Sequence, residues 1–170
     1  MSRRFLLLVL LQAVLLLGIV GKYYWIAATG QSITLKTAPI DPRDLFYGDY
    51  VRLEFDISRL DLRTIPHDLN GPLHDTAVYV VLEQKGKPWH EAVGVYQDKP
   101  QLAPGQTMLS GRVPYYSGDS WEKLPIVYGF ERYYVPENTG REIEQNAAAG
   151  WLADLRVAGS GEAVIRRLYR

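Results

Sequence analysis

The apolar residues of this chain follow two patterns, one continuous and one alternating. Residues 5–21 form an almost unbroken apolar run in which Gln12 is the only polar side chain, and residues 23–28 (Tyr-Tyr-Trp-Ile-Ala-Ala) extend the run beyond Lys22. A helix rises about 1.5 Å per residue and needs about 20 such residues to cross a bilayer. The pattern therefore predicts a transmembrane helix over residues 5–28, with its aromatic cluster at the lipid–water interface.

Two interpretations of this segment compete, an uncleaved anchor and a cleaved signal peptide. A cleavage site needs small residues directly after the apolar run, where this chain has Lys22 and three aromatic residues; the small residues 27–29 come later. We therefore expect an anchor. Arg3 and Arg4 precede the span, so the positive-inside rule places the N-terminus in the cytoplasm and the chain after Thr29 outside it.

Beyond Thr29, apolar and polar residues alternate in short segments, which predicts β-strands. The predicted strands are residues 32–37, 49–57, 76–83, 91–96, 107–115, 126–135, 151–157 and 163–169. We expect 76–83 at the centre of a sheet with 91–96 as its hairpin partner, and a hairpin from the last two strands. A capping box at Thr139–Glu142 predicts one short helix that ends near Ala149.

The predicted architecture is mainly β: an N-terminal transmembrane helix followed by an antiparallel β-sandwich or open barrel with one short helix. Residues 1–29 would form a cytoplasmic stub and the anchor, and residues 30–170 an extracytoplasmic β-rich domain. About 140 residues are a normal size for one hydrophobic core.

The strand predicted at residues 49–57 follows a sharp turn and has two faces. Asp and Pro initiate turns, and Gly accepts a positive φ; the predicted structural motif is Asp41, Pro42, Gly48 and Asp49. Alternation assigns one set of side chains to the core, namely Val51, Leu53, Phe55 and Ile57. The opposite, polar face carries Tyr50, Arg52 and Glu54.

Composition narrows the possible chemistry. Lys plus Arg and Asp plus Glu number 19 each, so no strong positive field favours a nucleic-acid partner. The chain has no cysteine, which excludes disulfides, thiolate metal sites and a cysteine nucleophile. His67 and His74 share a polar segment, but no metal-binding spacing is present. We predict no metal and no cofactor.

Catalytic motifs are equally sparse, and we assign no catalytic residue. Ser120 and Lys123 match Ser-x-x-Lys by letter only, because Pro125 follows and no helix is expected there. Asp44 and Asp49 flank the predicted turn, where capping of backbone amides is the simpler role. Aromatic residues bracket the loop Tyr115–Trp121, as a sugar-stacking platform would, although aromatic strand residues more often pack in the core.

Two blocks of the sequence resemble a known family. Residues 48–55 (Gly-Asp-Tyr-Val-Arg-Leu-Glu-Phe) resemble the motif for which the GDYXXLXY family is named, with Phe55 where that motif has Tyr. Residues 129–137 (Gly-Phe-Glu-Arg-Tyr-Tyr-Val-Pro-Glu) resemble a second block of the same family. The resemblance covers most of the chain. It implies a small bacterial protein of a family often associated with multi-spanning membrane proteins, and it carries over no catalytic residues. Together with the predicted anchor, this places the chain as a single-pass protein in the bacterial inner membrane.

Residues 48–51 (Gly-Asp-Tyr-Val) also resemble the strand that follows the catalytic serine of signal peptidases. In that pattern the nucleophile would stand eight positions before Gly48, where this chain has Ile40. Without a hydroxyl at that position, serine–lysine chemistry has no attacking atom.

We therefore expect a non-enzymatic, membrane-anchored accessory domain that binds a membrane or envelope protein. Its candidate surface consists of Tyr50, Arg52, Glu54, Glu131, Arg132 and Glu137. The alternative is an envelope hydrolase or sugar-binding module that uses carboxylates and the loop Tyr115–Trp121. Asp44, Asp49 and Glu131 converging in an open pocket would favour the alternative; carboxylates bound to backbone amides would favour the accessory domain.

Overall fold

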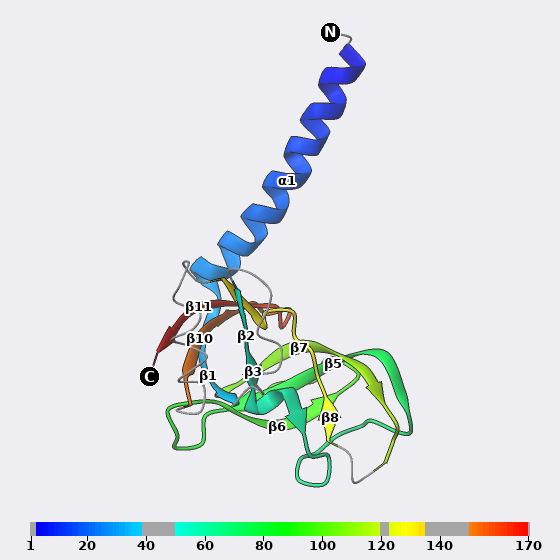
Figure 1. The fold of residues 1–170 in the computed structure, drawn as a ribbon, viewed down its shortest axis with the longest axis vertical. Helices are drawn as coiled ribbons and strands as arrows, with labels where there is room; N and C mark the ends of the chain where they lie inside the picture. Colours follow the sequence, from blue (N-terminus) through cyan, green and yellow to red (C-terminus); the bar gives the residue numbers. More distant parts are fainter. Residues whose placement is uncertain (1–2, 39–49, 120–122, 135–149, 170) are drawn as a thin grey trace.

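The computed structural model describes residues 3–38, 50–119, 123–134 and 150–169, in which one long helix stands on a β-rich domain (Figure 1). Several sequence predictions lie outside these residues: the turn motif (Asp41, Pro42, Gly48 and Asp49), Asp44, Trp121, Glu137 and the short helix after Thr139.

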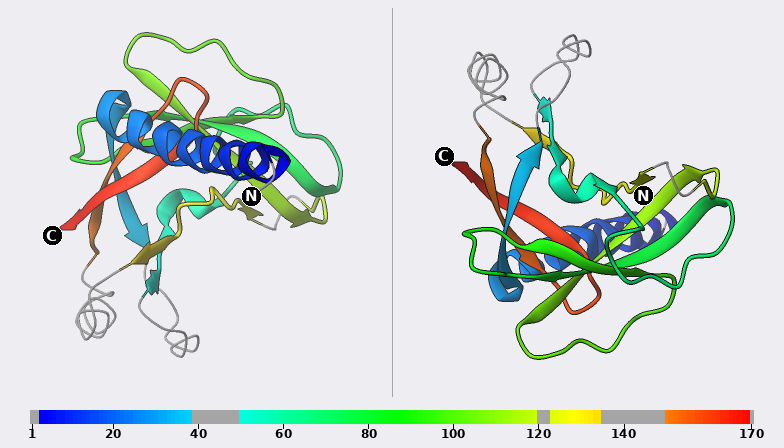
Figure 2. Two further views of the ribbon diagram at one scale, coloured as in Figure 1. Left: turned by 90° about the horizontal axis from the view of Figure 1, so that it is seen from above. Right: turned by 90° about the horizontal axis from the view of Figure 1, so that it is seen from below.

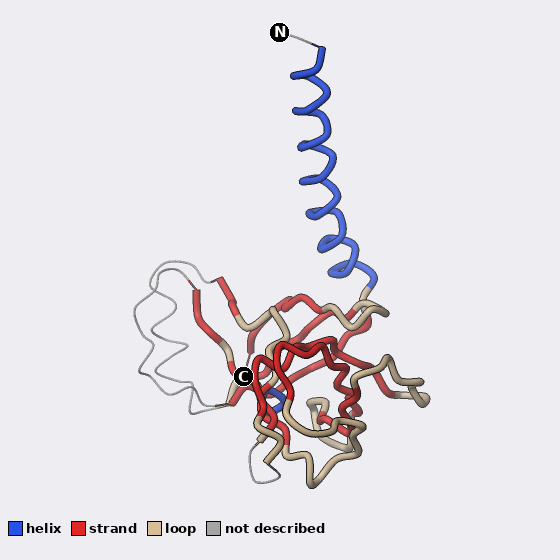
Figure 3. Tube along the Cα trace, turned by 90° about the vertical axis from the view of Figure 1, so that its right-hand side faces the viewer, coloured by secondary structure: helices blue, strands red, loops and turns tan. Residues whose placement is uncertain are grey.

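The helix α1 (Arg3–Thr29) is the one helix in the described part of the chain that is long and apolar enough to cross a membrane. Its mean hydropathy reaches 2.4, and within Arg3–Thr29 only Ile26 is buried. Figure 3 shows the helix standing over the domain, with the strands beyond its C-terminal end. In the view from above in Figure 2, the helix projects over the domain. Because burial of apolar surface is worth about 25 cal/mol per Å², this bare helix suits lipid far better than water.

The strands form two main sheets and two short ribbons, and every pairing of named strands is antiparallel. The first sheet has the order β11 (Ala163–Tyr169), β10 (Leu152–Val157), β1 (Gln31–Ala38) and β3 (Glu54–Phe55). The second has the order β6 (Glu91–Tyr96), β5 (Leu73–Glu83) and β7 (Gln106–Tyr116). The ribbons pair β2 (Tyr50–Arg52) with β9 (Arg132–Tyr134), and β4 (Arg59–Leu60) with β8 (Leu124–Pro125).

The two main sheets share one cluster of buried side chains. Ile33 and Leu155 enter it from the first sheet, and Val80 and Leu109 enter it from the second. The mainly β, antiparallel fold behind an N-terminal apolar helix is thus confirmed. The central position of β5, its hairpin with β6 and the C-terminal hairpin β10–β11 also agree with the sequence patterns.

The strand predicted over residues 49–57 is interrupted, although three of the four residues of its predicted core face are buried; the burial of the fourth, Val51, is not described. Leu53, Phe55 and Ile57 are all buried. The chain leaves β2 at Leu53, whose amide donates to the carbonyl of Glu131 at 2.7 Å, and it joins a different sheet as β3. A 3-10 turn, η2 (Asp56–Ser58), then replaces the strand, because the Ser58 hydroxyl accepts the Phe55 amide at 3.1 Å.

The single strand predicted over residues 126–135 is also wrong. Val127 forms only an isolated bridge with Arg112, and regular pairing resumes at β9. The physical reason is Gly129, whose φ of +90° turns the chain out of the extended conformation.

Candidate functional site

The ribbon of β2 and β9 brings together the two sequence blocks that resemble one family. Its register pairs Tyr50 with Tyr134, Val51 with Tyr133 and Arg52 with Arg132. The two strands are far apart in the chain, so only the fold makes them neighbours. The backbones of five predicted surface residues therefore lie in or directly beside this ribbon: Tyr50, Arg52, Glu54, Glu131 and Arg132.

Glu131 holds the turn that leads into β9. Its carboxylate accepts the backbone amide of Tyr128 in a short hydrogen bond and that of Gly129 at 2.8 Å. The carbonyl of the same residue accepts the amide of Leu53, which fixes the end of β2. A carboxylate that accepts hydrogen bonds from two backbone amides stabilises the local backbone conformation. Asp44 and Asp49, the other two carboxylates of the criterion that would separate a hydrolase from an accessory domain, lie outside the described residues.

Glu54 is engaged in a local ion pair rather than with the ribbon. Nε of Arg59 lies 2.7 Å from its Oε1, and this contact raises the pKa of the Arg59 guanidinium. The side chain of Arg59 is 69% exposed and that of Glu54 is 33% exposed. Such surface ion pairs contribute only about 0.2–1 kcal/mol to stability. Arg132 is exposed on β9. The polar surface beside the ribbon thus carries charges of both signs.

An aromatic cluster supports the ribbon from the core side. Phe130 packs edge-on against Phe55 and stacks on Tyr128, each at 5.5 Å between ring centroids. The Tyr128 hydroxyl donates to the carbonyl of Ile57 at 2.8 Å. Removal from water, reinforced by the nearby Glu131, raises the pKa of Tyr128 well above its usual value. These rings are therefore structural and hold β9 onto the domain.

In the described part of the loop Tyr115–Trp121, the two tyrosines do not form a shared exposed face for stacking. Tyr115 is 59% exposed and lies edge-on to His74. Tyr116 is buried, and its hydroxyl donates to the carbonyl of Asp119 at 2.8 Å. Trp121 is outside the described residues. Among the residues that the structure places, no group of three or more His, Asp and Glu side chains is arranged to hold a metal ion.

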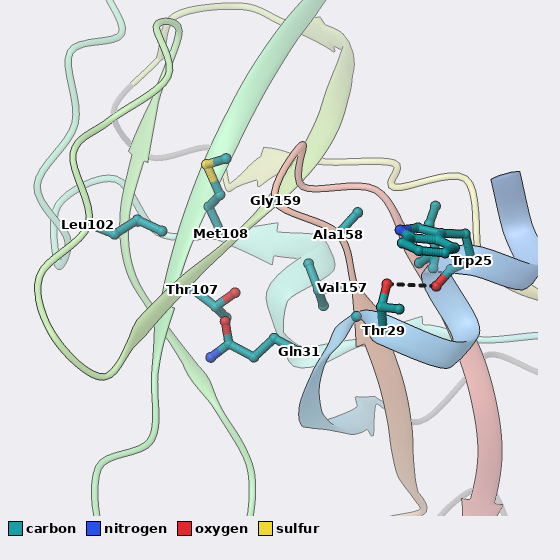
Figure 4. A pocket seen from close by; sticks show the side chains of 11 residues that line it. Trp25, Thr29, Gln31, Leu102, Thr107, Met108, Val157, Ala158 and Gly159 are labelled. Carbon is teal, nitrogen blue, oxygen red and sulfur yellow. Dashed lines mark hydrogen bonds between the residues drawn. The ribbon is translucent and has the colours of Figure 1, made fainter.

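Sequence reasoning missed a pocket at the base of α1 (Figure 4). Its volume is about 270 Å³. Three parts of the chain line it: the end of α1 with Trp25 and Thr29, the β6–β7 connection and start of β7 with Leu102 and Met108, and the β10–β11 turn with Ala158. The one sequence signal is Leu102, the only large apolar residue in the Pro- and Gly-containing segment 97–105.

Close contacts fix the walls of this pocket. Gly30 separates α1 from β1, and a Cβ there would lie 2.6 Å from the carbonyl oxygen of Ile26. Arg156 Nη1 donates to the Gly30 carbonyl at 3.1 Å, and Lys22 pairs with Glu162 at 2.6 Å. The helix is thus joined to the β10–β11 hairpin by a charged pair and by backbone packing, and the pocket has a defined shape.

Comparison with known proteins gives one match. The model of the family described as GDYXXLXY protein matches residues 12–168, nearly the whole chain. Neither a search of curated proteins nor a search of solved structures found a match.

Proposed function

Because the chain belongs to the GDYXXLXY family, whose two recognisable blocks are here paired as β2 and β9, we propose that it is a membrane-anchored accessory domain. In this proposal α1 stays in the bacterial inner membrane as an uncleaved signal anchor, and the β domain lies outside the cytoplasm. The surface around β2 and β9 binds a membrane or envelope protein, and a multi-spanning membrane protein is the expected class.

The observation that carries the proposal is the β2–β9 ribbon. Within the residues the structure describes, each of these strands pairs only with the other, so one edge of each has no described strand beside it. Exposed strand edges present backbone N–H and C=O groups that a second protein can complete by adding a strand. Side-chain contacts from Arg132 and Glu54 would then set the specificity.

The state of Glu131 supports a binding role for this surface over a hydrolytic one. Its carboxylate accepts hydrogen bonds from the amides of Tyr128 and Gly129. It therefore stabilises the turn beside the ribbon, and its oxygens are already occupied by these hydrogen bonds. A rigid ribbon lowers the entropy cost of association, because less conformational freedom is lost on binding.

Site-directed crosslinking in native membranes tests the proposal. The chain has no cysteine, so Arg132→Cys carries a unique thiol for a photoreactive crosslinker. Arg166→Cys is the matched control, because Arg166 is also an exposed arginine but lies on β11. We expect a discrete protein adduct from position 132 and none from position 166. Equal adducts from both positions, or none from either, would refute the proposed surface.

A further inference from the structure

The pocket at the base of α1 lies where a membrane-spanning helix would leave the bilayer. Tyr23, Tyr24 and Trp25 are 50%, 76% and 69% exposed, and aromatic residues of this kind concentrate at the lipid–water interface. Trp25 also lines the pocket. If α1 spans the membrane, the pocket therefore opens at the height of the lipid headgroups, where its neighbours are lipid molecules.

The lining of the pocket is mixed: Thr29, Gln31 and Thr107 are polar, and the other side chains that line it offer apolar contacts to a hydrocarbon chain. Met108 and Val157 form its inner wall and are buried, whereas Leu102 at its rim remains 40% exposed. Small-molecule sites usually measure about 300–1,000 Å³, so a pocket of about 270 Å³ is too small for a whole lipid. It is large enough for part of one acyl chain, with the rest of the lipid left in the bilayer.

The charge at the rim suits a phospholipid headgroup. Lys99 Nζ donates to the carbonyl of Gly159, a lining residue, at 3.0 Å. No carboxylate pairs with Lys99 within the described residues, so no ion pair there competes with a phosphate for this side chain. Basic side chains next to apolar clefts at a membrane surface recognise lipid phosphates.

We propose that this pocket binds a membrane phospholipid, with part of an acyl chain between Trp25, Leu102 and Met108 and the phosphate near Lys99. The inference rests on the proposed anchoring of α1. The bound lipid would complete the contact between the segment 97–105 and the bilayer and would hold this face of the domain against the membrane.

Lipid quenching of single labels tests the inference on the full chain. The protein is reconstituted in vesicles of phosphatidylcholine and phosphatidylglycerol, part of which carries a nitroxide on the acyl chain. One fluorophore is attached in turn to Val14→Cys in α1, Leu102→Cys at the pocket, and Tyr115→Cys. Tyr115 lies about 23–26 Å along β7 from the lining residues Thr107 and Met108, at about 3.3 Å per residue. We expect strong quenching at positions 14 and 102 and none at 115.

A second variant separates occupancy of the pocket from mere contact with the membrane. Ala158 lines the pocket, so Ala158→Trp should fill it and abolish quenching at position 102 while leaving position 14 and the circular dichroism spectrum unchanged. In the background of Lys99→Gln, quenching at 102 should lose its dependence on phosphatidylglycerol.

The outcomes distinguish this inference from the proposed anchor. Quenching at position 14 without quenching at 102 would overturn the lipid site and keep the anchor. Quenching at neither position would overturn both. Equal quenching at 102 and 115, or quenching at 102 that survives Ala158→Trp, would show general contact with the bilayer and would overturn the pocket as the binding site.

Discussion

Gly161, in the turn between β10 and β11, provides the sharpest test of how the two sheets are joined. Its carbonyl accepts the amide of Ser110 on β7 at 2.8 Å, and its own amide donates to Ala158 at 2.9 Å. Its φ is +90°, and a Cβ would lie 2.6 Å from the backbone nitrogen of Ser110. The turn of the first sheet is therefore in direct backbone contact with the second sheet, at a position that only glycine fits.

Gly161→Ala should destabilise the domain for two reasons that add. A side chain at positive φ costs about 1–2 kcal/mol, and overpacking against backbone that cannot retreat without moving β7 costs about 1–3 kcal/mol. The sum is about 2–5 kcal/mol, a large part of the 5–15 kcal/mol that ordinarily stabilises a domain. For a domain of this size, Tm should fall by about 6–20 °C.

The chain offers a matched control in the same turn. A Cβ at Gly159 would meet nothing within 4 Å, and its φ is not in the left-handed region. Gly159→Ala should therefore leave stability unchanged or raise it by up to about 1 kcal/mol, because alanine restricts the unfolded chain. Both variants are unfolded in urea as full-length protein in detergent, and tryptophan fluorescence reports the transition. Equal midpoints for the two variants would refute the proposed contact between the turn and β7.

Three further predictions concern the ribbon, the edge of the first sheet and the helix. Glu131→Ala should lower the free energy of unfolding by about 1–3 kcal/mol, because two amides lose their acceptor, and Glu131→Gln should lower it by less. A lower urea midpoint for Glu131→Gln than for Glu131→Ala would contradict the role of Glu131 as an acceptor for these amides. Burial alone would raise the pKa of Asp154, but hydrogen bonds from Arg167, Thr34 and Tyr169 outweigh it and lower that pKa. The resulting stability is present above the unfolded-state pKa of 3.8 and is lost as pH falls through the folded pKa. Asp154→Asn should therefore lower Tm at pH 7, and should lower it by less near pH 3. An equal loss of Tm at both pH values would contradict the lowered pKa of Asp154. Carbonate washing should leave the full-length protein in the membrane fraction, and its release would count against the anchor.

The sequence predicts the elements of this fold better than their partners. Alternation in residues 49–57 places Leu53, Phe55 and Ile57 correctly in the core, because the period of a strand is a local property. The change of partner at Leu53 depends on the carbonyl of Glu131, which lies far along the chain. Likewise Gly129 was visible as a glycine, but only the described backbone shows that it adopts a positive φ and ends the strand.

The candidate surface was partly predictable for the same reason. The two blocks that form β2 and β9 were recognisable separately, while their pairing and the capping by Glu131 are long-range results. The pocket at the base of α1 left almost no trace in the sequence. Each of its three segments contributes one or a few ordinary side chains, and no spacing rule joins Trp25, Leu102 and Ala158.

If the protein is anchored and binds a partner as proposed, the direct passage from α1 to β1 restricts how it reaches that partner. Gly30 alone separates the helix from the strand, and it is held by Ile26, Val157 and Arg156. A flexible linker would let the domain sample a volume that widens with linker length. Without one, an anchored domain keeps a constant height and tilt, and it explores its surroundings only by lateral diffusion and by rotation about the membrane normal. The β2–β9 ribbon would then meet partners only at a single level above the bilayer, which selects for proteins whose contact site is presented at that level.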